Sequence, residues 1–162
     1  MATTIGNIAI NVSDLERSER FYVDVLGLEP LPTPDFGFPV QWLRAGSLQV
    51  HVFERPDDPP AYAHFAFEVD DVVAVYERAS ELGILDRTAF GYAIAELPGG
   101  EAQLYLRDPA GNLLELDHPD GAAARKRIDE MILIADRLPQ PDGPTPRLFT
   151  SDLVSSANSG SA

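Results

Sequence analysis

The sequence predicts an α+β fold built from two copies of one module. Three observations carry this prediction. A pattern of strand, helix and three strands is written twice, strand-like segments alternate in hydrophobicity, and turn signals such as "PGG" and "DPAG" separate the elements. The copies span residues 5–55 and 63–118, and "RPDDPPAY" links them. Internal duplication at this length favours two similar units packed into one sheet system.

The first copy opens with "NIAINV", where Ile8, Ile10 and Val12 alternate with a more polar row that starts at Asn7. This alternation predicts a half-buried strand. In "SDLE", Ser13 is placed to cap a helix and Glu16 to complete a capping box. Apolar residues at helical spacing follow, and Gly27 ends the predicted helix. The remaining strands are predicted in "LEPLPT", "FPVQWLRA" and "SLQVHVFE".

The second copy repeats this order 57 residues later, so that His64 in "HFAFEV" aligns with Asn7. Asp70 is placed to cap its helix, and Gly83 ends it. Three further strands are predicted in "YAIAEL", "AQLYLR" and "NLLELD". We therefore expect residues 1–120 to form one domain made of two modules.

The composition changes after Pro119. Residues 121–138 are predicted to form a single C-terminal helix with one apolar stripe, which must dock on the core or on a partner chain. Residues 139–162 are rich in Pro, Ser and Gly and are expected to form a flexible tail, although "RLFT" could dock.

Charge and composition narrow the functional classes. Residues 1–120 hold 21 acidic and 7 basic side chains, whereas residues 121–162 hold 5 of each. A strongly acidic domain argues against nucleic-acid binding, which needs a basic surface. The 162 residues include no cysteine, which excludes disulfides and thiolate metal sites. No signal peptide or membrane-spanning stretch is evident, so we expect a cytoplasmic protein that does not engage a membrane.

Three segments carry a resemblance to a known family: "NIAINVSDLERSERFYVDVLGL", "AHFAFEVDD" and "LRDPAGNLLEL". Residues 5–118 resemble the vicinal oxygen chelate superfamily, which includes glyoxalase I, extradiol dioxygenases and fosfomycin- and bleomycin-resistance proteins. The resemblance implies two βαβββ modules whose mixed sheets curve around a cavity. It is specific for the fold and weak for the reaction, because this fold hosts many chemistries.

In metal-dependent members of the family, the ligands lie on the first and last strands of each module. Carried over one at a time, the usual His of the first strand falls on Asn7, and the usual Glu or Gln of the fourth falls on His51. The usual His and Glu of the second module fall on His64 and Glu115. Strand alternation supports His51, because Val50 and the other apolar residues of its strand form the opposite, packed row.

The resemblance therefore implies a metal site made of His51, His64 and Glu115. Two imidazoles and one carboxylate suit a divalent iron, manganese, nickel or zinc ion that acts on a small oxygen-chelating molecule. Glu115 and Tyr105 are the candidate catalytic residues. The candidate substrate-binding residues share the cavity-facing rows of the strands and are Asn7, Trp42, Phe53, Glu68, Gln103 and Tyr105, with Phe38 and Val40 beside them.

Two functional hypotheses remain open. The first is a metal-dependent lyase, isomerase or dioxygenase. The second is a metal-free protein similar to bleomycin-resistance proteins, which binds and sequesters a small, cationic molecule; the acidic domain favours it. Glyoxalase I itself, fosfomycin resistance and standard extradiol cleavage are disfavoured, because Asn7 replaces the first His that each of them uses. The resemblance also implies a homodimer in which both chains build each cavity.

Overall fold

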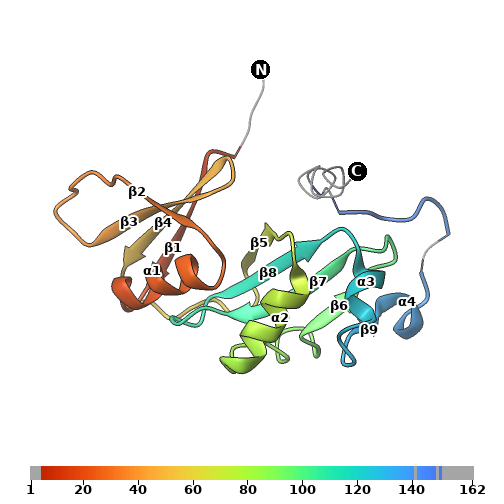
Figure 1. The fold of residues 1–162 in the computed structure, drawn as a ribbon. Coiled ribbons are helices and arrows are strands. Elements are labelled where there is room, and N and C mark those ends of the chain that lie inside the picture. Colours follow the sequence, from red (N-terminus) through yellow and green to blue (C-terminus); the bar gives the residue numbers. More distant parts are fainter. Residues whose placement is uncertain (1–4, 141, 149, 151–162) are drawn as a thin grey trace, which may run out of the picture. The chain divides into compact units, whose positions relative to one another are not determined.

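The structure, a computed structural model, describes residues 5–140, 142–148 and 150. The chain divides into two compact units. Unit 1 comprises the residues up to Ala61 together with Arg107–Asn112, and unit 2 comprises Tyr62–Leu106 together with the residues from Leu113 onward. Each unit contains one copy of the predicted module (Figure 1).

Unit 1 holds a four-stranded mixed sheet with the strand order β1-β4-β3-β2. β1 is parallel to β4, whereas β3 is antiparallel to both of its neighbours. In chain order its elements are β1 (Asn7–Val12), α1 (Leu15–Asp24), β2 (Glu29–Leu31), β3 (Val40–Ala45) and β4 (Leu48–Glu54). The predicted order of strand, helix and three strands is confirmed.

Unit 2 repeats this arrangement and adds a fifth strand at one edge, giving the order β5-β8-β7-β6-β9. The parallel pair of β5 and β8 corresponds to the pair of β1 and β4. Its elements are β5 (His64–Glu68), α2 (Val72–Glu81), β6 (Ile94–Glu96), β7 (Ala102–Arg107), β8 (Leu113–His118), α3 (Gly121–Arg125), β9 (Ile132–Leu133) and α4 (Ile134–Arg137). The α+β fold class is therefore confirmed.

Each sheet has one face packed against its helix, and this packing follows from strand alternation. In unit 1 the packed residues include Leu43, Val50 and Val52, none of which is exposed. Helix α1 contacts β3 and β4, and its Tyr22 is fully buried. In unit 2 the corresponding residues include Leu104 and Leu116. Burying each such side chain contributes roughly 1.5–3 kcal/mol. The opposite face of each sheet, here called its site face, carries the more polar row.

The helix caps differ from the prediction by one residue. Asp14, not Ser13, caps α1 by accepting a hydrogen bond from the backbone of Arg17. Asp71, not Asp70, caps α2 through the backbone of Ala74. In both helices the capping residue adopts a non-helical backbone conformation, which lets its carboxylate reach the free N–H two or three residues on.

The prediction of one helix over residues 121–138 is wrong. The structure contains two short helices, α3 and α4, with strand β9 between them. β9 pairs with β6 in parallel, with Ile132 opposite Ala95 and Leu133 opposite Glu96. The edge of β6 would otherwise leave backbone N–H and C=O groups unpaired, and the backbone of Ile132 and Leu133 pairs with this edge. Docking on the core is confirmed, because Ile128 is 2% exposed and Met131 6%.

The turn between β7 and β8 belongs to unit 1, together with Arg107 at the end of β7, although the rest of both strands belongs to unit 2. The buried hydroxyl of Tyr22 donates to Asp108 Oδ2 at 2.8 Å, and the side-chain amide of Asn112 donates to the carbonyl of Asn11 at 3.0 Å. Burial and the adjacent carboxylate of Asp108 raise the pKa of Tyr22. A segment of the second sequence copy therefore completes the packing around the first helix.

The predicted flexible tail extends beyond the described residues. Residues 141, 149 and 151–162 lie outside them, and so does part of the "RLFT" prediction. Among the described residues, no helix has the length and apolar character needed to cross a membrane.

Candidate functional site

The strand registers show which site-face positions correspond between the two copies. Ala9 pairs with His51 in unit 1, and Ala66 pairs with Glu115 in unit 2. Ala9 and Ala66 occupy the same position in the repeat, so His51 and Glu115 are equivalent. The equivalence that strand alternation predicts for these two residues is therefore present in the structure.

In unit 2 the structure brings three predicted residues, His64, Gln103 and Tyr105, around the carboxylate of a fourth, Glu115. Glu115 on β8 is 8% exposed. Its Oε2 accepts the hydroxyl of Tyr105 at 2.7 Å and lies 3.1 Å from His64 Nε2, while its Oε1 accepts the amide of Gln103 at 2.9 Å. Three neighbouring strands, β5, β7 and β8, supply these side chains. The carboxylate is therefore held in one orientation by groups on a rigid sheet.

A backbone carbonyl sets the orientation of the His64 ring. His64 Nδ1 lies 2.6 Å from the carbonyl oxygen of Tyr62. A carbonyl only accepts, so Nδ1 carries a proton and donates it. In the neutral ring, Nε2 then presents a lone pair toward Glu115. Two acceptors face each other in that state, and a proton or a metal cation between them makes the contact favourable.

Aromatic rings surround the tyrosine that holds Glu115. The ring of Phe90 lies 4.6 Å from that of Tyr105, and the ring of Tyr92 lies 6.1 Å from it. His64 meets Tyr105 edge-on at 5.8 Å. Burial, followed by the hydrogen bond to Glu115, raises the pKa of Tyr105 well above its usual range, so this tyrosine is a hydrogen-bond donor at neutral pH.

Two further carboxylates make this site face acidic. Asp117 follows Glu115 on the same face of β8 and is 9% exposed. Burial, and then the charges of Glu115 and Glu68, raise the pKa of Asp117. Glu68, a predicted substrate-binding residue, is half-buried on the neighbouring strand β5, where it pairs with Asp117 in the register.

In unit 1 the predicted residues gather around an aromatic pair. The ring of His51 stacks on Trp42 at 4.5 Å with an angle of 8° between the planes. His51 Nε2 lies 3.0 Å from the side-chain oxygen of Gln49, and burial lowers the pKa of His51. Asn7 is exposed and pairs with Gln49 in the register.

The rings of unit 1 form a closed series of contacts, here called the aromatic ring cluster. Neighbouring centroids lie between 4.5 and 6.5 Å apart, and the guanidinium of Arg55 lies 5.5 Å from the centre of one ring. The cluster consists of Phe36, Phe38, Phe53, His51 and Trp42. This face offers planar apolar contacts, whereas the face of unit 2 offers charge.

Three aromatic residues near the site, Phe36, Phe90 and Tyr92, were not predicted from the sequence. All three lie in irregular loops, between β2 and β3 or between α2 and β6, where strand alternation does not apply. The only sequence signal is the aromatic spacing in "FGF" and "FGY".

His64 and Glu115 fit two adjacent ligands of one metal ion. A nitrogen and an oxygen 3.1 Å apart match the separation of neighbouring ligands that each lie about 2.1 Å from an ion. Tyr62 and Tyr105 supply the outer hydrogen bonds that such ligands usually have. His51 lies in the other unit, and among the described residues no group of three or more His, Asp or Glu side chains could hold a metal. The three-residue site stays a prediction.

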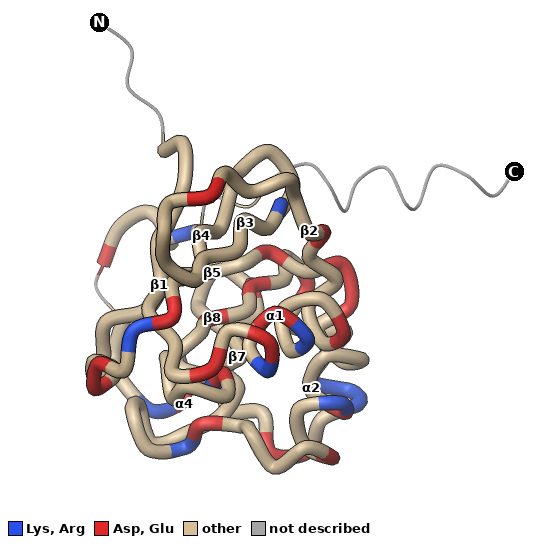
Figure 2. Tube along the Cα trace, turned by 90° about the vertical axis from the view of Figure 1, so that its left-hand side faces the viewer, with Lys and Arg blue, Asp and Glu red and all other residues tan. Residues whose placement is uncertain are grey.

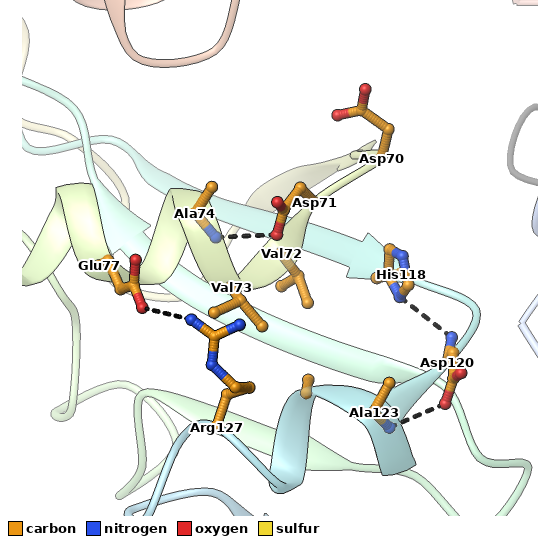
Figure 3. A pocket seen from close by; sticks show the side chains of 11 residues that line it. Asp70, Asp71, Val72, Val73, Ala74, Glu77, His118, Asp120, Ala123 and Arg127 are labelled. Carbon is orange, nitrogen blue, oxygen red and sulfur yellow. Dashed lines mark hydrogen bonds and ion pairs between the residues drawn. The ribbon is translucent and has the colours of Figure 1, made fainter. Parts of the chain in front are cut away.

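A separate pocket of about 250 Å³ lies in unit 2, on the packed face of the sheet rather than on the site face (Figure 3). The start of α2, the end of β8 and α3 form it. His118 accepts a hydrogen bond from the backbone of Asp120 there, and Arg127 pairs with Glu77 at 3.3 Å. His118 is the last residue of β8 and is half-buried. This pocket contains none of the predicted site residues.

Acidic side chains predominate along the trace of both units (Figure 2). The whole sequence has 26 acidic and 12 basic residues. Metal cations and cationic ligands are therefore favoured over highly anionic ones.

Comparisons with known proteins agree with the fold. A family model for the glyoxalase/bleomycin resistance protein/dioxygenase superfamily matches residues 4–116. The protein belongs to this superfamily. It is 24% identical over 147 residues to glyoxylase I 4 of Arabidopsis thaliana, which covers 84% of this chain and 82% of that protein.

Solved structures show the same fold. A lactoylglutathione lyase from Agrobacterium tumefaciens is 26% identical, with a TM-score of 0.55 over 72% of this chain and 94% of the other. A fosfomycin resistance protein, FosX, from Listeria monocytogenes is 21% identical, with a TM-score of 0.57 over 73% and 92%. The second likeness shows the fold alone.

Proposed function

We propose that the protein is a divalent-metal-dependent enzyme that acts on a small oxygen-chelating molecule. His64 and Glu115 are the central ligands in this proposal, and His51 is the third. One observation carries it. The His64 and Glu115 donor atoms lie 3.1 Å apart, and each residue has a further hydrogen bond that holds it in place. Iron, manganese, nickel and zinc all suit such ligands.

The bound ion would supply Lewis-acid polarisation of a substrate oxygen. Neighbouring residues of the protein hold the two ligands, His64 and Glu115, in position. Tyr62 fixes the His64 ring, and Gln103 and Tyr105 hold the two oxygens of Glu115. The hydroxyl of Tyr105 stays protonated at neutral pH and can donate a hydrogen bond to an anionic oxygen that displaces Glu115 from it. Lyase, isomerase and dioxygenase activities are all consistent with this arrangement.

The aromatic ring cluster is the proposed contact for the apolar part of the substrate. Trp42 and Phe53 belong to it, and Asn7 lies at the end of the same face. Glu68 and Gln103 would contact polar groups from the site face of unit 2. We further propose that the protein is a homodimer in the cytoplasm. A monomer in light scattering at micromolar concentration would contradict the dimer.

Elemental analysis of protein purified without chelators or a metal-affinity tag tests the metal proposal. We expect stoichiometric metal in the wild type and its loss in His64→Ala and in Glu115→Ala. His118→Ala is the matched control, because His118 lies on the packed face of the sheet, and it should retain the metal. Wild-type protein that takes up no iron, manganese, nickel or zinc would disprove the proposal.

The acidity of the unit 2 site face favours a second function, in which the protein binds a small cationic molecule without metal. Asp117 and Glu68 lie beside Glu115. Burial and these neighbouring carboxylates raise the pKa of Asp117 to about 8, and an ammonium group bound between them would favour its charged form. Isothermal titration of the metal-free protein with a cationic aromatic compound distinguishes the two. Micromolar affinity that falls in Asp117→Asn would support this second function, and no detectable heat would exclude it for that compound.

A further inference from the structure

Glu101, immediately before β7, is a buried carboxylate that neither proposed function uses. It is 4% exposed, and its Oε2 has no hydrogen-bond partner among the described residues. Gln103 and Tyr105 lie on the site face of the same strand, and alternation places Glu101 in their row. The guanidinium of Arg147 lies 3.9 Å from Oε1, and the Arg147 side chain is itself 72% exposed. An ion pair this long and exposed stabilises little.

A close backbone approach accounts for the burial of Glu101. A Cβ atom at Gly99 would lie 2.7 Å from the carbonyl oxygen of Pro146 and closer still to Glu101 Oε2. The segment that contains Pro146 therefore passes directly over Gly99 and Glu101. Gly99 does not have a left-handed φ angle, so its lack of a side chain serves this approach and not a turn.

The segment that covers Glu101 lies outside the part of the chain that matches the family. The family model ends at residue 116, and the two solved structures described above cover 72% and 73% of this chain. Beyond residue 116 the chain adds β9 to the sheet edge and then α4. Ala95, which pairs with Ile132 of β9 and lies on the site-face side of β6, is completely buried.

We propose that residues 142–148 form a strap that closes the Glu101 end of the unit 2 site face, and that release of the strap exposes the Glu101 carboxylate to ligand. Released, Glu101 would extend the row of Gln103 and Tyr105 by one anionic group. It would suit an amine or hydroxyl group of the ligand. This last step rests on the proposed function, whereas the strap itself does not.

The variant Gly99→Ala tests the strap, because its methyl group and the Pro146 carbonyl cannot occupy the same space. Gly6→Ala is the matched control. Gly6 has no atom within 4 Å of an added Cβ and no left-handed φ angle. Thermal unfolding of the three proteins should give similar midpoints, since the substitution at position 99 displaces only a peripheral segment and the side chain of Glu101.

Two measurements report the position of the strap in the full-length protein. The first is the rate at which trypsin cleaves after Arg147, followed by mass spectrometry of the released C-terminal fragment. The second is modification of Glu101 by a water-soluble carbodiimide and an amine, with the exposed Glu16 as internal reference. In Gly99→Ala we expect cleavage to accelerate about tenfold and Glu101 to become modified, because both reactions need the open form.

An unchanged cleavage rate in Gly99→Ala would overturn the strap even if Glu101 becomes modified, because the added methyl group also displaces the Glu101 carboxylate directly. Faster cleavage in Gly6→Ala as well would overturn it too. Neither measurement depends on bound metal or on turnover. A protein that binds no metal but shows the expected changes would therefore disprove the proposed metal function and retain the strap.

Discussion

Glu115 has three partners at hydrogen-bond distance, and these partners have two different roles. Tyr105 and Gln103 fix the carboxylate, while His64 shares the metal in the proposed site. The two repeat copies place His51 at the same position in unit 1, where it stacks on Trp42. The same strand position therefore carries a charged group in one copy and an aromatic one in the other.

Removing the Tyr105 hydroxyl should weaken metal binding without unfolding the site. In Tyr105→Phe the ring still packs on Phe90, but Glu115 loses its 2.7 Å hydrogen bond. Partners of metal ligands typically contribute 10- to 100-fold in affinity, so we expect a loss of about tenfold or more. Competition titration with a chromophoric zinc chelator measures it.

Tyr76→Phe is the matched control for this measurement, because Tyr76 also donates to a carboxylate, Glu130, away from the site. Equal zinc affinity in the wild type and both variants would show that Tyr105 does not support a metal ligand.

The sequence predicts most of the site at the residue scale, because side-chain direction along a strand follows a period of two. This rule places His51, His64, Glu115, Gln103 and Tyr105 on the site faces. It does not reach the loop residues Phe90 and Tyr92, whose rings meet Tyr105 only through the path of an irregular loop. The stacking of His51 on Trp42 likewise depends on the register of β3 and β4.

At the scale of elements, the caps of the two helices offer a direct test. Asp14→Ala should lower the free energy of unfolding by about 1 kcal/mol, because the N–H of Arg17 loses its acceptor. Ser13→Ala should change it by less than about 0.5 kcal/mol. Urea unfolding measures both variants. The reverse order would mean that Ser13 caps α1, as the sequence pattern suggests.

A surface network joins α2 to the segment after α3 and should give a defined pH dependence. Glu130 accepts from Tyr76 and from Arg87, and the hydrogen bond from Arg87 lowers the pKa of Glu130 below its ordinary value of 4.5. A carboxylate with a lowered pKa stabilises the folded state above its unfolded pKa, and this stability is lost as the pH falls through the folded pKa.

The variant Glu130→Gln should therefore be less stable than the wild type at about pH 7, and the difference should shrink below about pH 4.5. Urea unfolding at several pH values measures the two free energies. A difference that does not change with pH would show that the charge of Glu130 plays no part.

The order of the elements in both copies could be predicted from periodicity and turn residues, but the C-terminal segment could not. Its apolar spacing fits a helix from 121 to 138. The open edge of β6 instead draws Ile132 and Leu133 into a strand. The local sequence pattern cannot predict this pairing, because the unpaired edge of β6 exists only once the sheet has formed.

At the scale of the whole molecule, the single hydrogen bond between Tyr22 and Asp108 should contribute measurably to stability, because it joins segments 86 residues apart in the sequence. Both residues are buried, and Tyr22→Phe removes the donor from the Asp108 carboxylate. We expect a loss of roughly 1–3 kcal/mol in the free energy of unfolding, measured with urea. Tyr62→Phe, at a 64% exposed position, is the control and should be nearly neutral. Equal stability of both variants would argue against this contact.

The turn that carries Asp108 also determines where the polypeptide can be cut into fragments that each contain a complete unit. The polypeptide changes unit after Ala61, after Leu106 and after Asn112. A fragment that stops at Ala61 would contain every strand of its sheet, yet it would lack the six residues Arg107–Asn112 and leave the Tyr22 hydroxyl without its acceptor. The second fragment would have to be present to supply them. Although the sequence is duplicated, the first copy therefore depends on a segment of the second copy for its own packing.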